Sequence, residues 1–246
     1  MSQKSNSNLS HKNFSKILII GDSGVGKSSL LQTFNLLKES QKAKPTVGAE
    51  FYSKQLTLQE FPSSLYKGQE VHLQIWDTAG QERFQSLCTA FYRGTDCCVI
   101  VFDLSDLATY SNVEKWVSTF QQVMGDDIKH DIPIILVGNK SDKERLIDSQ
   151  TINEYWVDSG KAKIYIESSA HNKDGVENIF YGAGFYSHEY QLMRKRQSME
   201  RKASGSPRGK IQVQKRDSFR TSNRRESNLI LERHSKTKYG ASKCSC

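Results

Sequence analysis

The most constraining feature of this sequence is one short segment, Gly21-Asp22-Ser23-Gly24-Val25-Gly26-Lys27-Ser28, which matches the pattern G-x-x-x-x-G-K-[ST] of phosphate-binding loops. The apolar run 17–20 before it predicts a buried strand, and residues 29–34 after it predict the start of a helix. The segment therefore lies between a strand and a helix, the context in which such a loop binds phosphate. The alternative is an ordinary glycine turn, and the motifs below argue against it.

The residue types of this segment suit a bound phosphate. Glycines allow the tight turn that brings several N–H groups to one point, and the positive end of a helix attracts an anion. We expect Lys27 to contact the β- and γ-phosphates and the Ser28 hydroxyl to ligate Mg²⁺. The predicted phosphate-contacting residues are Gly21, Ser23, Gly24, Val25, Gly26, Lys27, Ser28 and Ser29.

Apolar patterns predict an alternation of strands and helices. The expected strands are 17–20, 47–57, 71–76, 97–103, 132–138 and 163–166, and the later helices are 112–124, 149–158 and 176–190. This order predicts an α/β fold with a mostly parallel six-stranded sheet, one antiparallel edge strand from the 47–76 hairpin, and helices on both faces. A ligand is then expected at the carboxyl ends of the strands.

Three local details accompany these elements. Ser149 or Thr151 is expected to cap the helix over 149–158. Gly182 and Gly184 should weaken the last helix by about 1 kcal/mol each relative to Ala. The connection 58–70 is unusually long for a hairpin.

The charge is unevenly distributed along the chain. Residues 191–246 contain sixteen of the 35 Lys and Arg residues but only four of the 27 Asp and Glu residues, so they carry a net charge of +12 and residues 1–190 carry −4. We expect a disordered lead at 1–14, one folded domain at 15–190 and a disordered basic tail at 191–246. Basic residues in the tail favour contact with an acidic surface, not binding of nucleic acid by the folded domain. Neither a membrane span nor a signal peptide is expected.

Two further polar segments follow predicted strands. Asp77 lies where a strand ends opposite the phosphate loop and can hold Mg²⁺. Shortly after it, the Gly80 N–H can contact a γ-phosphate and Gln81 can orient an attacking water. In the segment 139–142, the Asp142 carboxylate can accept the N1–H and the amine of guanine, a donor pair that adenine lacks. The alternatives are a strand-end cap at Asp77 and an ordinary turn at 139–142.

Together these segments resemble the motifs of Ras-superfamily small GTPases over residues 15–190. The motifs are the phosphate loop, Asp77-Thr78-Ala79-Gly80-Gln81, Asn139-Lys140-Ser141-Asp142 and Glu167-Ser168-Ser169-Ala170. Within the superfamily the chain resembles the Rab family, through 47–51, 73–76, 83–87, 91–94 and a Cys-x-Cys end, and within that family the late-endosomal branch. The resemblance implies a P-loop NTPase fold, GTP or GDP with Mg²⁺, and slow hydrolysis that an activating protein accelerates.

The resemblance also implies roles for single residues. Thr46 would be the switch I threonine that binds Mg²⁺ and the γ-phosphate, and Gln81 would be the catalytic residue of switch II. The implied Mg²⁺ ligands are Ser28, Thr46 and Asp77. The implied guanine-binding residues are Asn139, Lys140 and Asp142, supported through the backbone by Ser169 and Ala170. The implied effector-facing aromatic triad is Phe51, Trp76 and Phe91, for which the alternative is three core aromatics.

Two positions depart from the family pattern. Counting from Lys27, the switch I aromatic that contacts the base falls at Glu39, and no aromatic lies between Phe34 and Phe51. His171 stands where the family usually has Lys. We therefore expect weaker nucleotide retention than in a typical Rab, and slow release of labelled GDP would contradict this.

The end of the chain resembles a doubly geranylgeranylated terminus at Cys244 and Cys246, for which the alternative is two unmodified thiols. Two lipid chains and a basic tail anchor a protein stably, whereas one lipid chain does not. The implied location is the cytoplasmic face of an endomembrane (late endosome, lysosome or vacuole), in exchange with the cytosol. The implied partners are effectors, an exchange factor, an activating protein and a prenyl-delivery or extraction chaperone, with a monomeric domain and no nucleic acid.

The predicted function is a membrane-anchored GTP/GDP switch that hydrolyses GTP and recruits effectors in vesicle trafficking. Two alternatives remain, a nucleotide-locked scaffold and a membrane adaptor that functions through its tail. Gln81 favours a cycling switch. Replacing Lys27 with Asn should disable a switch and leave such an adaptor functional.

Overall fold

The protein is described by a computed structural model over residues 14–36, 46, 48–78, 90–125 and 132–203. Six strands form one sheet in the order β2-β3-β1-β4-β5-β6, in which β2 is antiparallel to β3 and the other pairs are parallel. The strands are β1 (Ser15–Ile20), β2 (Ala49–Thr57), β3 (Glu70–Thr78), β4 (Cys97–Asp103), β5 (Ile134–Asn139) and β6 (Ile164–Glu167). This confirms the predicted six-stranded sheet with one antiparallel edge strand.

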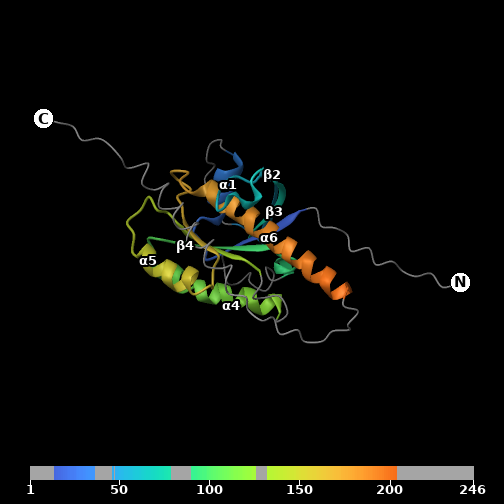
Figure 1. Ribbon diagram of the computed structural model, residues 1–246. Helices are drawn as coiled ribbons and strands as arrows, with labels where there is room; N and C mark the ends of the chain where they lie inside the picture. The colour runs from blue at the N-terminus through green and yellow to red at the C-terminus, as the bar shows by residue number, and fades with distance from the viewer. Residues whose placement is uncertain (1–13, 37–45, 47, 79–89, 126–131, 204–246) are drawn as a thin grey trace.

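Helices cover both faces of this sheet, as Figure 1 shows. One face is covered by α1 (Lys27–Leu36) and α6 (Val176–Ala203). The other is covered by α3 (Leu107–Ser111), α4 (Val113–Met124) and α5 (Ser149–Ile152), which continues into a π-helical turn at Asn153–Asp158. None of the helices among the described residues is long and apolar enough to cross a membrane.

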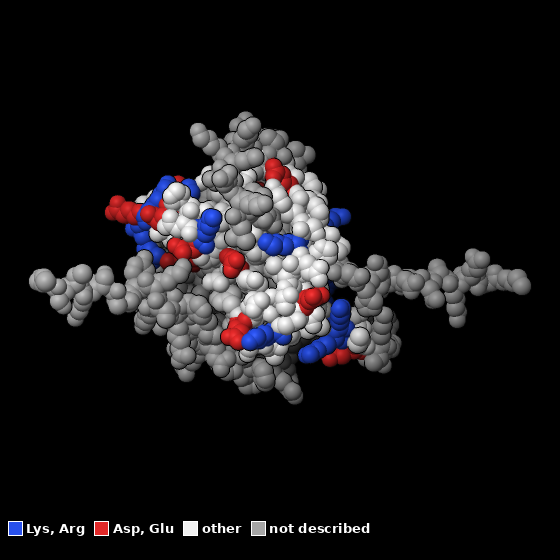
Figure 2. All heavy atoms as spheres, turned by 90° about the horizontal axis from the view of Figure 1, so that it is seen from above, with Lys and Arg blue, Asp and Glu red and all other residues white. Residues whose placement is uncertain are grey.

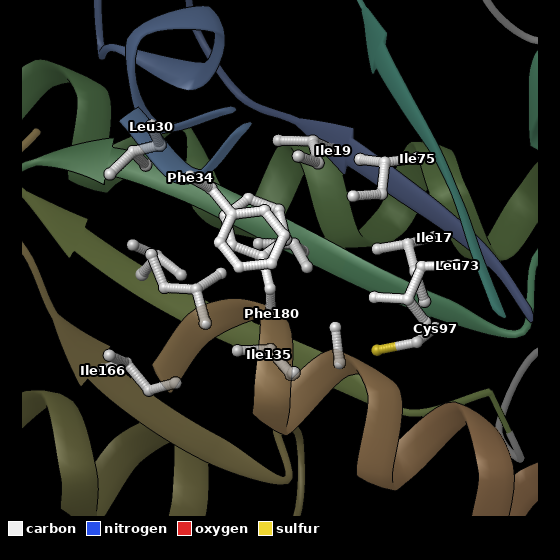
Figure 3. Close-up of a cluster of buried hydrophobic side chains, with 14 of the residues drawn as sticks. Ile17, Ile19, Leu30, Phe34, Leu73, Ile75, Cys97, Ile135, Ile166 and Phe180 are labelled. Atoms are coloured by element: carbon white, nitrogen blue, oxygen red, sulfur yellow. The ribbon is translucent and has the colours of Figure 1, made fainter. Parts of the chain in front are cut away.

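The core consists of two apolar layers, one on each side of the central strands. β4 and β5 are buried along their whole length, because helices cover both of their faces. In the layer under α1 and α6, the rings of Phe34 and Phe180 stack with centroids 3.9 Å apart (Figure 3). Cys97 and Cys98 point into opposite layers as free thiols, and burial raises the pKa of both.

The start of α5 differs from the sequence-based expectation. Its N-cap is Asp148, whose carboxylate accepts a hydrogen bond of 3.0 Å from the Thr151 N–H. The Ser149 hydroxyl donates instead to Glu167 on β6, at 2.6 Å. The prediction that Ser149 or Thr151 caps this helix was therefore wrong, because a carboxylate one residue earlier provides a better acceptor. The predicted single helix over 149–158 is also only one α-helical turn followed by the π-helical turn.

The C-terminal boundary of the folded domain also needs correction. We expected α6 to end near Tyr190 and disorder to begin at Gln191, but the helix continues to Ala203. Residues 191–203 contain neither Gly nor Pro and are rich in Lys, Arg, Gln and Met, which favour helix. The Gln191 side chain donates to the Phe14 carbonyl at 3.0 Å, and Met193 packs against the core. These contacts extend the helix beyond the predicted boundary.

The long connection between β2 and β3 packs against α6. It carries the 3₁₀ turn Ser64–Tyr66, and the Tyr66 ring contacts Phe185 and His188 at centroid distances of 5.1 and 5.0 Å. The helix runs unbroken through Gly182 and Gly184. A Cβ atom at Gly184 would lie 3.1 Å from Leu58 of the connection, so this glycine permits a close approach.

Candidate functional site

The phosphate-binding segment forms the turn between β1 and α1. A Cβ atom at Gly21 (φ +141°) would lie 2.1 Å from the Val101 carbonyl oxygen, and one at Gly26 (φ +98°) would lie 2.3 Å from the Asn139 amide nitrogen. Only glycine fits these two positions, because both the backbone angle and the space exclude a side chain. The β4 backbone and the Asn139 side chain can thus lie directly against the loop.

Within this loop, the Lys27 side chain is almost fully buried. Its ammonium group donates to the carbonyl oxygens of Gly21 and Asp22, at 2.8 and 2.7 Å. Ser23 and Gly24 are exposed, Val25 is buried in the core, and Ser28 and Ser29 are half-buried in the first turn of α1. The loop therefore places one cation at the positive end of a helix, an arrangement suited to a polyphosphate.

The three predicted metal ligands lie together beside this loop. The Ser28 hydroxyl donates to Asp77 Oδ2 and lies 2.8 Å from the Thr46 hydroxyl. The sheet explains this, because Asp77 on β3 is in register with Ile19 on β1, just before the loop. Asp77 is fully buried, and its Oδ1 atom has no hydrogen-bond partner among the described residues.

The electrostatics of this cluster indicate a place for a cation. Burial raises the pKa of Asp77, and the hydrogen bond from Ser28 and the charge of Lys27 only partly oppose that effect. A buried carboxylate oxygen without a partner is costly unless a positive charge lies beside it. One carboxylate and two hydroxyl groups are oxygen donors of the kind that Mg²⁺ accepts together with phosphate oxygens. The residues present therefore fit Mg²⁺.

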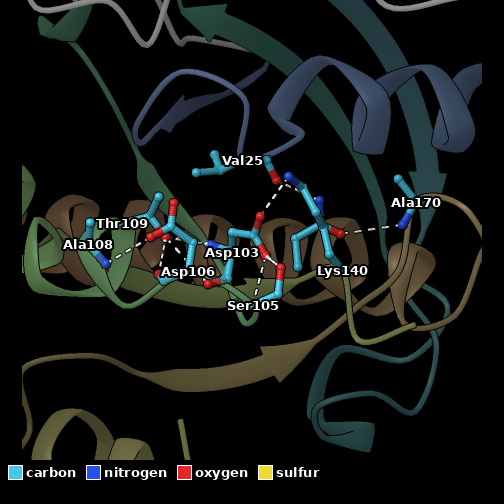
Figure 4. A network of polar contacts seen from close by, with 9 residues as sticks. Val25, Asp103, Ser105, Asp106, Ala108, Thr109, Lys140 and Ala170 are labelled. Carbon is cyan, nitrogen blue, oxygen red and sulfur yellow. Dashed lines mark hydrogen bonds and ion pairs between the residues drawn. The ribbon is translucent and has the colours of Figure 1, made fainter. Parts of the chain in front are cut away.

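The predicted base-binding residues lie at the ends of β5 and β6. The Asp142 side chain is exposed, and its Oδ1 accepts a hydrogen bond of 2.5 Å from the Ser169 hydroxyl, which lowers the pKa of the carboxyl. Lys140 adopts a left-handed backbone conformation (φ 63°). Its ammonium pairs with Asp103 Oδ2 at 2.6 Å (Figure 4). The hydrogen bond from Ser169 thus holds the charged Asp142 carboxylate at the surface in a fixed orientation.

Asn139 occupies a different position from Asp142, because its side chain is buried. Its amide donates to the Val25 carbonyl at 2.7 Å and accepts from the Ser168 hydroxyl and the Ala170 N–H, both at 3.3 Å. Asn139 therefore joins the phosphate loop to the 168–170 segment. The geometry gives it a positioning role, and direct contact with a base stays a prediction.

Comparison with known proteins places the chain in a family. A model described as the Ras family matches residues 16–185. The chain belongs to the Ras family. RABG3b of Arabidopsis thaliana is 40% identical over 169 residues, which cover 67% of this chain and 79% of that protein. The Ypt/Rab-type GTPase YPT7 of Saccharomyces cerevisiae is 38% identical over 173 residues, covering 69% and 79%, and Rab-7a of Dictyostelium discoideum is 40% identical over 166 residues, covering 67% and 78%.

The similarity to these relatives shows that the chain is a Rab small GTPase of the late-endosomal branch, an enzyme that hydrolyses GTP. The Rab-type aromatic side chains form one continuous group at the surface. The Trp76 ring lies 5.3 Å from both Phe51 and Phe91, and Phe51 is 48% exposed. Trp76 and Phe91 are half-buried, and Trp76 also packs against the core, so the effector-facing role of the three stays a prediction.

A polar network that we did not predict lies beside the predicted base-binding residues of this Rab domain. Glu167 accepts from Arg145, from Ser149 at 2.6 Å and from Tyr165 at 3.0 Å. It connects the segment after Asp142 to the segment that carries Ser169. The only sequence signal was a Glu directly before Ser168, and nothing local identified its partners.

Several predicted residues lie outside the described part of the chain. They are Gly80 and Gln81 of the switch II segment, Glu39 at the switch I position where the family has an aromatic residue, and Cys244 and Cys246 at the C-terminus. Their roles stay predictions. On the face in Figure 2, the described basic and acidic side chains are interspersed, and no continuous area of one sign covers the described part of that face.

Proposed function

We propose that this GTPase is a membrane-anchored GTP/GDP switch that acts on a late-endosomal or vacuolar membrane and recruits effectors there. One observation supports a nucleotide site here. Lys27, the Ser28–Asp77 pair and Asp142 all lie at the carboxyl ends of parallel strands of the same sheet. The similarity to Rab7 proteins supports the choice of membrane.

The described residues divide the work of binding between phosphate and base. Lys27 and the loop N–H groups stabilise the negative charge of the phosphates, including the charge that develops on the β-phosphate as the γ-phosphoryl leaves. Ser28, Thr46 and Asp77 hold Mg²⁺, which neutralises phosphate charge when bound. Asp142, held by Ser169, accepts the guanine donor pair. The remaining proposed nucleotide contacts are Gly21, Ser23, Gly24, Val25, Gly26, Ser29, Gly80, Asn139, Lys140 and Ala170.

The switching step depends on the γ-phosphate. Thr46 and Gly80 contact it in the GTP state, and its loss on hydrolysis releases both segments. Gln81 orients the attacking water. The phosphate-loop motif contains no arginine that could contact the γ-phosphate, so hydrolysis is slow until an activating protein supplies one. Such an arginine accelerates hydrolysis roughly 10³–10⁵-fold among GTPases such as Ras. The group of Phe51, Trp76 and Phe91 then contacts effectors.

A nucleotide competition experiment tests the proposal. Wild-type protein should bind GTP and GDP and reject ATP, and Asp142→Ala should lower GDP affinity about 100-fold or more, since two hydrogen bonds to a charged group are lost. Ser169→Ala should have a smaller effect, because the carboxylate stays but loses its orienting bond. Equal binding of ATP and GTP would contradict the proposal. Single-turnover hydrolysis with an activating protein separates a cycling switch from a nucleotide-locked scaffold.

A further inference from the structure

One residue of the phosphate loop contacts a distant helix. The Asp22 carboxylate accepts two hydrogen bonds from α4, one from the Trp116 indole N–H to Oδ1 and one from the Asn112 amide to Oδ2, both at 2.7 Å. Ninety or more positions separate Asp22 from its partners. The side chain thus points away from the phosphates, while its own carbonyl oxygen accepts a bond of 2.7 Å from Lys27.

The Asn112 amide and the Trp116 indole donate to Asp22 instead of to acceptors within their own helix. Asn112 stands at the N-cap of α4, where Asn usually caps its own helix, but its side chain makes no cap hydrogen bond there. Trp116 is buried, and it is the one tryptophan of the three whose indole N–H has an acceptor among the described residues. The pair therefore forms a specific acceptor site for the carboxylate.

The position of the contact relates it to nucleotide binding. The loop backbone has residues with positive φ on both sides of Asp22, Gly21 before it and Gly24 and Gly26 after it. Such a chain needs outside contacts to stay in one conformation. α4 provides a rigid support, because Trp116, Val117 and Phe120 are buried in the core. We propose that Asp22 is a positioning residue that fixes the phosphate loop to α4 and thereby sets how long the bound guanine nucleotide is retained.

The donor pattern dictates the chemistry at position 22. Two N–H donors require two acceptor atoms, which a carboxylate supplies. An amide at position 22 supplies one acceptor and one donor, so it suits this site only if an acceptor faces it from position 112. Asp22→Asn combined with Asn112→Asp therefore restores both hydrogen bonds with the charge moved to α4.

The experiment measures release of fluorescent GDP from the full chain. Asp22→Ala and Asn112→Ala should release GDP roughly tenfold faster than wild type, because buried donors or acceptors lose their partners. The double variant Asp22→Asn/Asn112→Asp should return to within about threefold of wild type. Glu114→Gln is the matched control, because this α4 carboxylate accepts from Lys161 at 2.8 Å and does not contact the loop; its release rate should equal that of wild type.

A second measurement reads the contact itself. In an NMR spectrum of the indole N–H groups, Trp116→Phe identifies the Trp116 signal, which should lie downfield because it donates to a carboxylate. Asp22→Ala should shift that signal upfield, and the double variant should restore it, whether or not any nucleotide is bound. A general loss of packing would not produce this selective rescue.

The outcomes separate the two proposals. Failure of wild-type protein to bind GDP would overturn the nucleotide site and the positioning role with it. Wild-type release rates in Asp22→Ala and Asn112→Ala, or an unchanged Trp116 signal in Asp22→Ala, would overturn the positioning role alone. Because Asn112→Ala leaves the loop sequence intact, it decides the question even if Asp22→Ala does not fold.

Discussion

At the scale of a single residue, Asp77 has the least favourable surroundings in the candidate site. It is fully buried, and one of its oxygen atoms has no hydrogen-bond partner among the described residues. Such a group costs about 1–3 kcal/mol when it stays unpaired. A cation bound beside it would remove this cost, and Mg²⁺ is the cation that the neighbouring Ser28 and Thr46 hydroxyls favour.

We therefore predict opposite effects of Asp77→Asn on function and on stability. The variant should release GDP rapidly at any Mg²⁺ concentration, whereas wild-type release should accelerate only when the metal is chelated. The nucleotide-free variant should unfold in urea with a free energy within about 0.5 kcal/mol of wild type or higher, because a neutral amide replaces a carboxylate whose charge is disfavoured by burial. Glu50→Gln is the control, because Glu50 is the residue of β2 that lies opposite Asp77 in the strand pairing. This variant should keep the Mg²⁺ response. A persistent Mg²⁺ response in Asp77→Asn would exclude Asp77 as a ligand.

At the scale of elements, the contact between α6 and the β2–β3 connection distinguishes two glycines. A Cβ atom at Gly182 would lie 3.5 Å or more from its neighbours, whereas one at Gly184 would lie 3.1 Å from Leu58 and 3.3 Å from Val71. Both positions carry the same propensity cost in a helix.

We predict that Gly182→Ala stabilises the fold by about 0.5–1 kcal/mol, the difference in helix propensity. Gly184→Ala should gain less, because Leu58 and Val71 must move by a few tenths of an ångström, and Gly184→Val should destabilise by about 1–3 kcal/mol. Urea unfolding of the three variants measures this. Equal gains for both alanine variants would show that the connection does not pack closely on α6.

The same contact should respond to pH through His188. Burial against the connection lowers the pKa of this imidazole, and the charge of Lys195 acts in the same direction. The unfolded chain therefore binds more protons than the folded one between the lowered pKa and about 6.5, so stability falls as the pH drops through that window.

We expect amide exchange in residues 58–69, corrected for the intrinsic rate, to be faster at pH 5.5 than at pH 7.5. His188→Gln should remove this difference, because glutamine does not titrate. Tyr66→Leu serves as a control that keeps the imidazole but loses the ring contact at 5.0 Å. If the difference persisted in His188→Gln, the pH response would have to arise elsewhere.

At the scale of the whole molecule, the basic charge and the two terminal cysteines lie beyond the folded domain. Residues 1–203, which include the whole of α6, contain 24 Lys and Arg and 24 Asp and Glu residues and so carry no net charge, whereas residues 204–246 carry +8. None of the described helices is long and apolar enough to cross a membrane. We propose that attachment depends on the tail, through two lipid chains and its positive charge.

We predict that changing both Cys244 and Cys246 to Ser leaves GDP affinity unchanged and moves the protein from the membrane to the soluble fraction in cells. A single Cys→Ser change should give partial, reversible attachment, because one chain binds only marginally. Fractionation after expression in a prenylating host measures both. Full membrane retention of the double variant would refute the lipid anchor.

The sequence by itself determined the features that depend on neighbouring residues. The strand, glycine turn and helix around Lys27 follow from a contiguous pattern, and alternating apolar runs predicted the six strands. The position of the predicted base-binding segment was also readable, because a buried strand ends there, at Asn139, shortly before Asp142. Local backbone preferences and hydrophobic periodicity suffice for these features.

Only the tertiary structure decided which distant residues meet. It placed Asp77 beside Ser28 through the pairing of β3 with β1, gave Glu167 and Asp22 their partners, and chose Asp148 over Ser149 as a cap. It also extended α6 to Ala203. These features depend on packing between segments many residues apart, and the free energy that selects them arises only when those segments bury surface and exchange hydrogen bonds with one another.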